Sequence, residues 1–476
     1  MASRNISFDN IPASIRKPGK YFEFNTRLAV RTLPANAQAM LIVAQRLAAG
    51  SVAELVPTKV FSDAEASNYF GAGSHAHIMA TAAIKANPYL DLTIVALDDA
   101  ATAVEAAGTI TIGGPATSSG SIKFFIGNKM VELGVASGDT AAAIAASLVA
   151  EVAKSPELPV TVAVDGVIPE QLDITAKNGG TIGNSIGLAR EISAGGVTAT
   201  IVAMAGGAAD PDITDALTPV FAEQYQIVVT ALNDETSLTA LRTHLDAVSG
   251  PLEQRPGRGV YATTGLLAAA TTLAADINSG RMNHVYLRAT RSLDIELAAA
   301  YGAVMAWEED PAMPLNTLAL VGIHAPAIEQ RLSRNEQESL LHNGVSPLEV
   351  GPGERVQIVR AITTYTLDPQ GIEDVSLLDT TTIATLDYVR KACRERISLR
   401  FPRAKLSSKT PDRVKTELLD VLLKLEELEI VEEVLANKDG LVVERDLQDV
   451  NRLDAKIPAD VVNGLHVFAG RIDLLL

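Results

Sequence analysis

LLHNGVSPLEVGPGERVQIVRAITTYTLDP, residues 340–369, is the stretch from which the organisation of the chain is most readily inferred. Within it, Val356, Ile358 and Ile362 lie two or four residues apart. Apolar residues at this spacing are typical of a β-strand, whose side chains point alternately to opposite faces. The preceding residues 350–354, VGPGE, have the glycines and the proline of a turn and lead into the strand. We therefore expect a strand close to a sheet edge here.

A helix rich in arginine is predicted for the following segment, DVSLLDTTTIATLDYVRKACRERISLRFPR, residues 374–403. Its cations include Arg390, Lys391, Arg394 and Arg396, which stand out because the chain as a whole is acidic. Arg390 and Arg394 are four residues apart and would share one helical face. A charge run of this kind is commonly a solvated helix face. The alternative is a docking surface for an acidic partner.

The order of turn, strand and helix in these two segments resembles the C-terminal domain of contractile tail sheath proteins, in particular the Mu-like phage branch. The resemblance is carried by Asn343-Gly344-Val345, Val359-Arg360, Thr363-Thr364, Asp379-Thr380 and Tyr388-Val389-Arg390. It implies a non-enzymatic structural subunit that polymerises around an inner tail tube and contracts to drive the tube through the target envelope. It also implies that the four cations dock on the tube, that baseplate and tail terminator proteins are further partners, and that no cofactor is needed.

Composition indicates a chain of several domains with an acidic surface. The 476 residues are 47% hydrophobic, and 57 Asp and Glu outnumber 40 Lys and Arg, for a net charge of -17. This balance argues against a general nucleic-acid surface, which needs clustered positive charge. The single cysteine, Cys393, excludes an intrachain disulfide. With no secretory pattern and no apolar run near the roughly 18 residues of a membrane span, we expect a soluble protein made in the cytoplasm. The resemblance implies assembly in the host cytoplasm and a place in the virion tail.

Strand and helix patterns alternate in two parts of the chain that flank a different region. Met40–Ala44 and Leu92–Leu97 are continuous apolar runs, which suit strands covered on both faces. Three further strand and helix repeats lie within residues 209–338, so we predict an α/β core with a doubly wound sheet. The resemblance adds that this core is subtilisin-like. Residues 105–208 are dense in Gly, Thr and Ser and predict an inserted, mostly β domain.

The ends of the chain are predicted to be extended arms. Residues 1–30 contain short apolar alternations broken by proline and glycine, and residues 461–476 read as one long strand. We expect these arms to pair with sheet edges in the C-terminal domains of neighbouring subunits. The residues expected to take part in this exchange are Tyr21, Phe22, Phe24, Val356, Ile358, Ile362, Leu465, Val467, Ile472 and Leu474. The full domain order is an N-terminal arm (1–30), core (31–104), inserted domain (105–208), core (209–338), α+β sheath domain (339–460) and C-terminal arm (461–476).

One pattern in the sequence is typical of a hydrolase, but its surroundings favour a simpler explanation. Gly183–Gly187 fits the G-x-S-x-G pattern of a nucleophile elbow around Ser185, but a buried strand and a helix should flank an elbow, and this segment is glycine-rich. We find no convincing Asp, His and Ser set on the α/β core. We therefore predict no catalytic residue. An α/β hydrolase or a nucleotide-binding enzyme of the cytosol is the alternative, and a pocket that holds Ser185 with a His and an acid would favour it.

Metal and cofactor sites are not predicted either. His75 and His77 could hold a metal together on a strand, but the segment reads as the start of a helix, where positions two apart diverge. Gly71–Ser74 lacks the third glycine of a dinucleotide fingerprint and reads as a turn. Cys393 has no candidate base beside it in the sequence and is interpreted as inert. A phage tail sheath and the related sheath of a tailocin or secretion system cannot be separated by these patterns.

Overall fold

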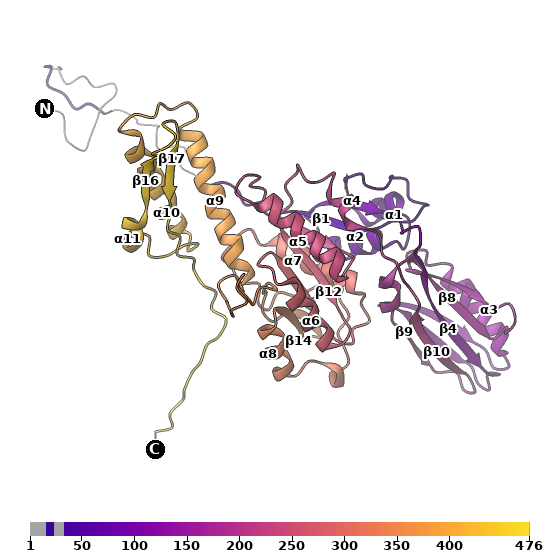
Figure 1. The fold of residues 1–476 in the computed structure, drawn as a ribbon. Coiled ribbons are helices and arrows are strands. Elements are labelled where there is room, and N and C mark those ends of the chain that lie inside the picture. The colour runs from indigo at the N-terminus through magenta and orange to yellow at the C-terminus, as the bar shows by residue number, and fades with distance from the viewer. Residues whose placement is uncertain (1–15, 23–32, 476) are drawn as a thin grey trace. The chain divides into compact units, whose positions relative to one another are not determined.

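The computed structural model describes residues 16–22 and 33–475. Its contacts divide the chain into two compact units, which we call the core unit and the hairpin unit (Figure 1). The core unit comprises residues 36–388, 429–432 and 459–476. The hairpin unit comprises residues 1–35, 389–428 and 433–458.

A mixed eight-stranded sheet forms the centre of the core unit, in the order β15-β14-β13-β12-β11-β1-β3-β2. The strands from β14 to β3 in this order are parallel, whereas β15 and β2 are antiparallel to their neighbours at the two edges. Their bounds are β1 Ala39–Gln45, β2 Thr58–Lys59, β3 Asp91–Leu97, β11 Ile227–Thr230, β12 Arg258–Thr263, β13 Met282–Tyr286, β14 Val345–Gly351 and β15 Arg355–Ile358.

Helices cover this sheet because its central strands are apolar on both sides. All residues of β11 are buried, as are Met40–Gln45 of β1. Helices α2 and α7 pack on each other and on β1, and α4, α5 and α6 form a second row. The helix bounds are α1 Asp63–Phe70, α2 His75–Ala86, α4 Ile213–Leu217, α5 Glu235–Ser249, α6 Leu267–Ile277, α7 Asp294–Trp307 and α8 Arg334–His342. The unit is therefore of the mixed α/β class.

The inserted segment contains two sheets and one α-helix, with strand orders β10-β4-β8-β7 and β6-β5-β9. Its elements are β4 Glu105–Gly113, β5 Gly120–Ile126, β6 Lys129–Val135, α3 Ala141–Val152, β7 Val160–Val164, β8 Gln171–Gly179, η2 Thr181–Ser185, β9 Leu188–Ile192 and β10 Thr198–Ala205. In β4 and β8 buried and more exposed residues alternate, with Ile110 and Ile174 on the buried side. This alternation is the reason that the segment forms sheets with one buried face, whose side chains join the hydrophobic core of the unit.

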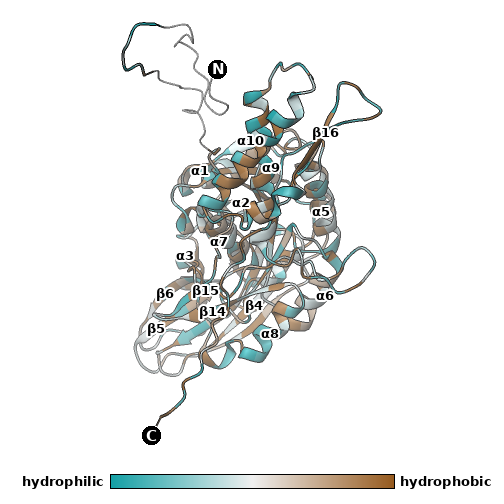
Figure 2. Cartoon of the chain, turned by 90° about the vertical axis from the view of Figure 1, so that its left-hand side faces the viewer, coloured by the Kyte–Doolittle hydropathy of each residue, from teal (hydrophilic) through white to brown (hydrophobic). Residues whose placement is uncertain are grey.

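The helices and strands of the hairpin unit lie between Val389, inside a long helix, and Pro458, just after a β-hairpin. Its elements are the second half of α9 (Thr380–Arg400), α10 (Thr410–Glu427), α11 (Val434–Asn437), β16 (Val442–Arg445) and β17 (Leu453–Lys456). Val414, Leu418, Val421 and Leu425 form a buried stripe on α10. In Figure 2, α10 accordingly carries separate hydrophobic and hydrophilic faces, the pattern of an amphipathic helix.

The boundary between the units differs from the one predicted at residue 339. Strands β14 and β15 belong to the eight-stranded sheet, because β14 pairs in parallel with β13 through Tyr286 and Pro347. The contact boundary therefore falls at Val389, within α9. Local alternation predicts that a strand exists, but a parallel pairing of residues about 60 positions apart leaves no mark in the sequence of either strand.

Candidate assembly surfaces and the core pocket

The β16–β17 hairpin offers two open sheet edges. The strands pair antiparallel from Val442 with Lys456 to Arg445 with Leu453. Among the described residues, neither strand has a second partner strand. The outer side of each strand therefore presents unpaired backbone N–H and C=O groups, which are a template for an added strand.

An apolar groove with a volume of about 420 Å³ lies beside this hairpin within the same unit. Apolar side chains from three parts of the unit line the groove. They are Ile397 of α9 and Phe401 just after it, Val414 and Leu418 of α10, and Leu453 and Ala455 of β17 with Ile457 just after it. Cys393 also lines the groove. Burial raises the pKa of its thiol to about 11, so the thiol is protonated near neutral pH and is a poor nucleophile.

The C-terminal segment is attached to the core unit at its root. Val461 forms a bridge with Val431, and the Val462 amide donates to the Ile430 carbonyl (3.3 Å). Further along, His466 Nδ1 shares a hydrogen bond of 2.9 Å with Asn316 Nδ2. The predicted long strand over 461–476 is not formed within the subunit, where the described residues after the bridge are extended without strand pairing.

Beyond this root, the apolar side chains of the C-terminal segment are exposed. Phe468 is 88% exposed, and Ile472 is 98% exposed. The candidate residues Leu465, Val467 and Leu474 are also exposed. Tyr21 and Phe22 of the N-terminal segment are exposed as well, whereas Phe24 lies outside the described residues. Apolar side chains that stay in water in one subunit are available for contacts with another.

The edge predicted around Val356, Ile358 and Ile362 is not open in the subunit, which corrects that expectation. All three side chains are buried. Strand β15 pairs with β14 on one side, and on the other side the Leu320 amide donates to Val356 O (2.8 Å). Ile358 N likewise donates to Leu318 O (3.0 Å). The chain itself therefore occupies both sides of this strand.

The arginine-rich helix is partly internal. Arg396 is 5% exposed, and its Nη1 lies 2.7 Å from Asp420 Oδ2 and 3.2 Å from Glu417 Oε2. Arg396 therefore joins α9 to α10, and its guanidinium group is not exposed on the surface of the subunit as the prediction of a docking residue would require. Its partners on α10 follow more than 20 positions later in the chain, so the charge run alone did not reveal them. Lys391 donates through Nζ to the Ala35 carbonyl (2.6 Å), and Arg390 and Arg394 also have partners.

Exposed cations are instead concentrated in the loop between α9 and α10. Arg403, Lys405 and Lys409 are exposed there. No ion pair joins any of these three to an acid among the described residues. The Arg413 guanidinium lies over the Phe401 ring at 5.6 Å from its centroid. Arg403 and Lys405 belong to the predicted charge run, and the sequence signal for the basic loop is the lack of acids between residues 396 and 411.

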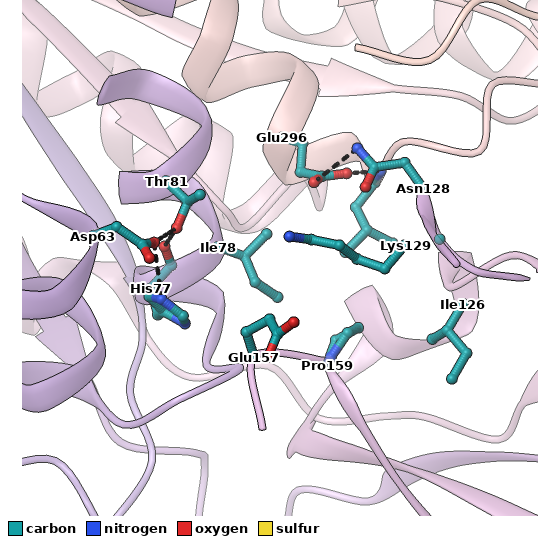
Figure 3. Close-up of a pocket in the computed structure, with 12 residues that line it drawn as sticks. Asp63, His77, Ile78, Thr81, Ile126, Asn128, Lys129, Glu157, Pro159 and Glu296 are labelled. Carbon is teal, nitrogen blue, oxygen red and sulfur yellow. Dashed lines mark hydrogen bonds and ion pairs between the residues drawn. The ribbon is translucent and has the colours of Figure 1, made fainter. Parts of the chain in front are cut away.

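A pocket in the core unit contains titratable side chains (Figure 3). On one wall, His77 Nδ1 accepts a hydrogen bond from the Gly73 amide (3.0 Å), so its Nε2 carries the proton and donates to Asp63 (3.1 Å). Thr81 donates to the same carboxylate. Burial lowers the pKa of His77 despite the nearby Asp63, so the ring is neutral near pH 7.

The opposite wall of the pocket belongs to the inserted domain and α7. Glu296 accepts from the Leu293 amide (2.8 Å) and from Asn128 Nδ2 (3.3 Å). Burial raises the pKa of this carboxyl group. Figure 3 shows the amine of Lys129 pointing into the pocket between these walls. The hydrogen bonds of Asn128 fix the β5–β6 turn to the core, so the pocket is a junction between the inserted domain and the core.

The residues considered for enzyme chemistry have local structural partners. Ser185 lies in a 3₁₀-helix of the inserted domain and donates to Ile182 O (2.8 Å). His75, in the first turn of α2, donates through Nδ1 to Gln45 Oε1 (2.9 Å), and burial lowers its pKa to about 4. Within the described ranges, no group of three or more His, Cys, Asp or Glu is arranged to hold a metal.

In the part of the chain that the structure describes, no helix is both long enough and apolar enough to cross a bilayer.

Comparison with known proteins identifies the class. The family model of the phage tail sheath protein central domain matches residues 206–364, and that of the phage tail sheath C-terminal domain matches residues 373–474. Both matches are to structural subunits of contractile tails. The chain is also 33% identical to the Mu-like prophage FluMu tail sheath protein of Haemophilus influenzae, over 99% of this chain and 100% of that protein. The chain therefore belongs to the phage tail sheath family, in its Mu-like branch, and is a contractile tail sheath subunit.

Solved structures share the fold. The sheath tail protein of Desulfitobacterium hafniense gives a TM-score of 0.52 at 13% identity, with 94% of this chain and 97% of that chain covered. The sheath tail protein of Listeria innocua gives a TM-score of 0.51 at 13% identity, with 92% and 94% covered. At these identities the similarity concerns the fold, and it extends over nearly the whole chain.

Proposed function

We propose that the subunit polymerises into a helical sheath by exchanging its terminal segments with neighbouring copies. The observation that carries the proposal is the match between two open edges on the β16–β17 hairpin and two exposed apolar terminal segments. A neighbour's residues around Tyr21 and Phe22 would add to one edge, and residues 465–474 of another neighbour to the other. Backbone hydrogen bonds then join the copies into a mesh.

The groove beside the hairpin would receive the apolar side chains of an added strand. Alternate residues of a strand point to one face, so a segment that pairs with the hairpin places every second side chain over the groove. Its lining of aliphatic and aromatic side chains suits Phe468 or Val467. Burial of such a side chain contributes about 1.5–3 kcal/mol, which adds to the hydrogen bonds of the strand.

The inner tail tube is the proposed partner of the basic loop. Arg403, Lys405 and Lys409 are exposed and form no ion pair among the described residues, and an acidic tube surface would complement them. Lys391, Arg390 and Arg394, which the sequence suggested first, would add to the positive charge near the tube but would not be its main contacts. Baseplate and tail terminator proteins would bind the two ends of the sheath.

The core unit would move as a rigid body when the sheath contracts and drives the tube through the target envelope. Its parallel strands, covered by helices, support the interpretation as a doubly wound, subtilisin-like core that supplies stiffness and no chemistry. In this proposal the free energy for contraction is stored at assembly, and the protein resides in the virion tail.

A cysteine pair tests the exchange directly, because Cys393 is the only cysteine of the chain and lines the groove. Phe468→Cys and Val467→Cys are adjacent on a strand and face opposite sides. We expect mild oxidation of assembled sheaths to link subunits covalently in one of these two variants and not in the other. The unmodified chain, with Cys393 alone, is the control. Equal linkage in both variants, or none in either once sheaths are seen by electron microscopy, would remove the groove as the receiving site.

A further inference from the structure

An exposed aromatic pair on the core unit takes no part in the proposed strand exchange. Trp307, the single tryptophan of the chain, is 57% exposed, and Tyr89 is 86% exposed. Their ring centroids lie 6.1 Å apart, with an angle of 43° between the planes. Aromatic residues form only 4% of the chain. Large aromatic side chains are typical anchors of protein interfaces, so a solvent-exposed pair indicates an interaction surface.

The pair is held in place by two packed helices. Residues 297–306 of α7 are all buried, and the helix reaches the surface at Trp307. Asn87, which ends α2, donates through Nδ2 to Ala303 O of α7 (3.2 Å). The Oδ1 of the same side chain accepts from the Tyr89 amide (3.1 Å). Asn87 thus fixes the turn that carries Tyr89 to the helix that carries Trp307, and a surface ordered in advance binds at a lower entropic cost.

The surroundings of the two rings are acidic. Trp307 is followed by Glu308, Glu309 and Asp310, and no ion pair joins these carboxylates to a cation in residues 16–22 or 33–475. The last turn of α7 has no basic residue, so its terminal carbonyls add to the negative potential. Aromatic faces beside carboxylates suit a Lys or Arg side chain, which can lie over a ring and pair with an acid at the same time.

The N-terminal segment of the chain carries a matching set of cations. Residues 1–35 contain six Lys or Arg against two Asp or Glu, although the whole chain has a net charge of -17. Arg16, Lys17 and Lys20 are exposed and lie within five residues of one another. The charge of this segment is therefore opposite to that of the rest of the chain and complementary to the acidic aromatic surface.

We infer that the surface formed by Tyr89 and residues 307–310 is a docking site for the basic segment Arg16–Lys20 of a second copy of the chain. The inference rests on the proposed polymerisation, which brings copies together, but it uses a surface other than the hairpin. One cation of the segment lies against the Tyr89 and Trp307 rings, and the others pair with the carboxylates. Because the contact is electrostatic, it guides the arm toward its neighbour, and added salt weakens it.

Fluorescence of the single tryptophan tests the site in the full-length protein. We expect acrylamide quenching of Trp307 to fall when free subunits assemble into sheaths. In a variant with Arg16→Glu, Lys17→Glu and Lys20→Glu, quenching should remain at the level of the free subunit. The matched control, Arg16→Lys with Lys17→Arg and Lys20→Arg, keeps the charges and should protect Trp307 as the natural chain does. Equal protection in the charge-reversed variant would overturn the inference.

A peptide of residues Arg16–Phe22 gives a second measurement that does not depend on assembly. Titrated into free subunits, it should shift the emission of Trp307, and the shift should be lost with Glu309→Lys or at high salt. No shift at any concentration would contradict the docking site even if the charge-reversed variant fails to assemble. Sheaths that form with Trp307 still open to quenching would leave strand exchange intact and remove only the docking site.

Discussion

The eight-stranded sheet and the β16–β17 hairpin differ in whether the backbone groups at their edges are hydrogen-bonded within the subunit. The sheet closes its β15 edge with residues 317–320 of its own chain, and its central strands are buried under helices. The hairpin has two strands with no further partner among the described residues. A two-stranded hairpin is marginal by itself and gains from a third and fourth strand. The difference indicates that the β15 side of the sheet is closed within one subunit, whereas the hairpin leaves room for further strands.

The largest expected effect tests this difference at the C-terminal segment. Deletion of residues 467–476 removes the exposed apolar side chains that follow His466 but keeps His466 itself and the root that pairs with residues 430–432. We expect complete loss of sheath formation by electron microscopy. The free energy of unfolding should change by less than about 0.5 kcal/mol, because the deleted side chains are exposed. Leu475→Ser, at the tip, is the control that should still assemble. Normal sheaths from the deleted chain would contradict strand exchange through this segment.

The sequence predicted the core better than the surfaces, for a physical reason. The continuous apolar runs of β1 and β3 identify central strands because burial on both faces demands apolar residues at every position. Whether a strand edge is open depends on which distant segment lies beside it, and residues 318–320 occupy the β15 edge although the local pattern around Ile358 resembles that of an edge strand.

The environment of a charged side chain also depends on segments that are distant in the sequence. The run from Arg390 to Arg403 is visible in the sequence, but Arg396 is distinguished from Arg403 only by Glu417 and Asp420 on the next helix. The exposure of apolar residues in the C-terminal segment could be expected, because a segment without a core of its own keeps its apolar residues in water. The docking surface at Trp307 could not be expected from the sequence, because it depends on the packing of the end of α2 beside the end of α7.

A second prediction separates the two kinds of cation within the hairpin unit. Arg396→Met removes the buried partner of Glu417 and Asp420, which keep the longer contacts to Arg400 (3.5 Å) and Lys424 (3.7 Å). Loss of the hydrogen bonds of Arg396 should cost up to about 3 kcal/mol. We expect hydrogen exchange of α9 and α10 to speed up strongly while exchange in the core sheet is unchanged. The matched control is Arg403→Glu with Lys405→Glu and Lys409→Glu. It should leave hydrogen exchange unaffected and weaken assembly on the tube. If only the control variant lost stability, the loop cations would be the structural ones and Arg396 would not be.

The smallest of the three effects is an acid response confined to the core unit. All seven histidines lie in the core unit, and burial lowers the pKa of His75 to about 4 and that of His284 to about 3. A histidine whose folded pKa is below its unfolded value of about 6.5 contributes stability above pH 6.5, and that stability is lost as the pH falls toward the folded pKa. Each of these two rings should therefore cost the core about 2 kcal/mol by pH 5. The variant His75→Asn, whose amide can still donate to Gln45, should flatten this pH dependence. Hydrogen exchange measured at pH 7 and at pH 5 should show that the core unit opens before the hairpin unit. The hairpin unit contains no histidine. An equal acid response in that unit would therefore contradict an origin in histidine protonation.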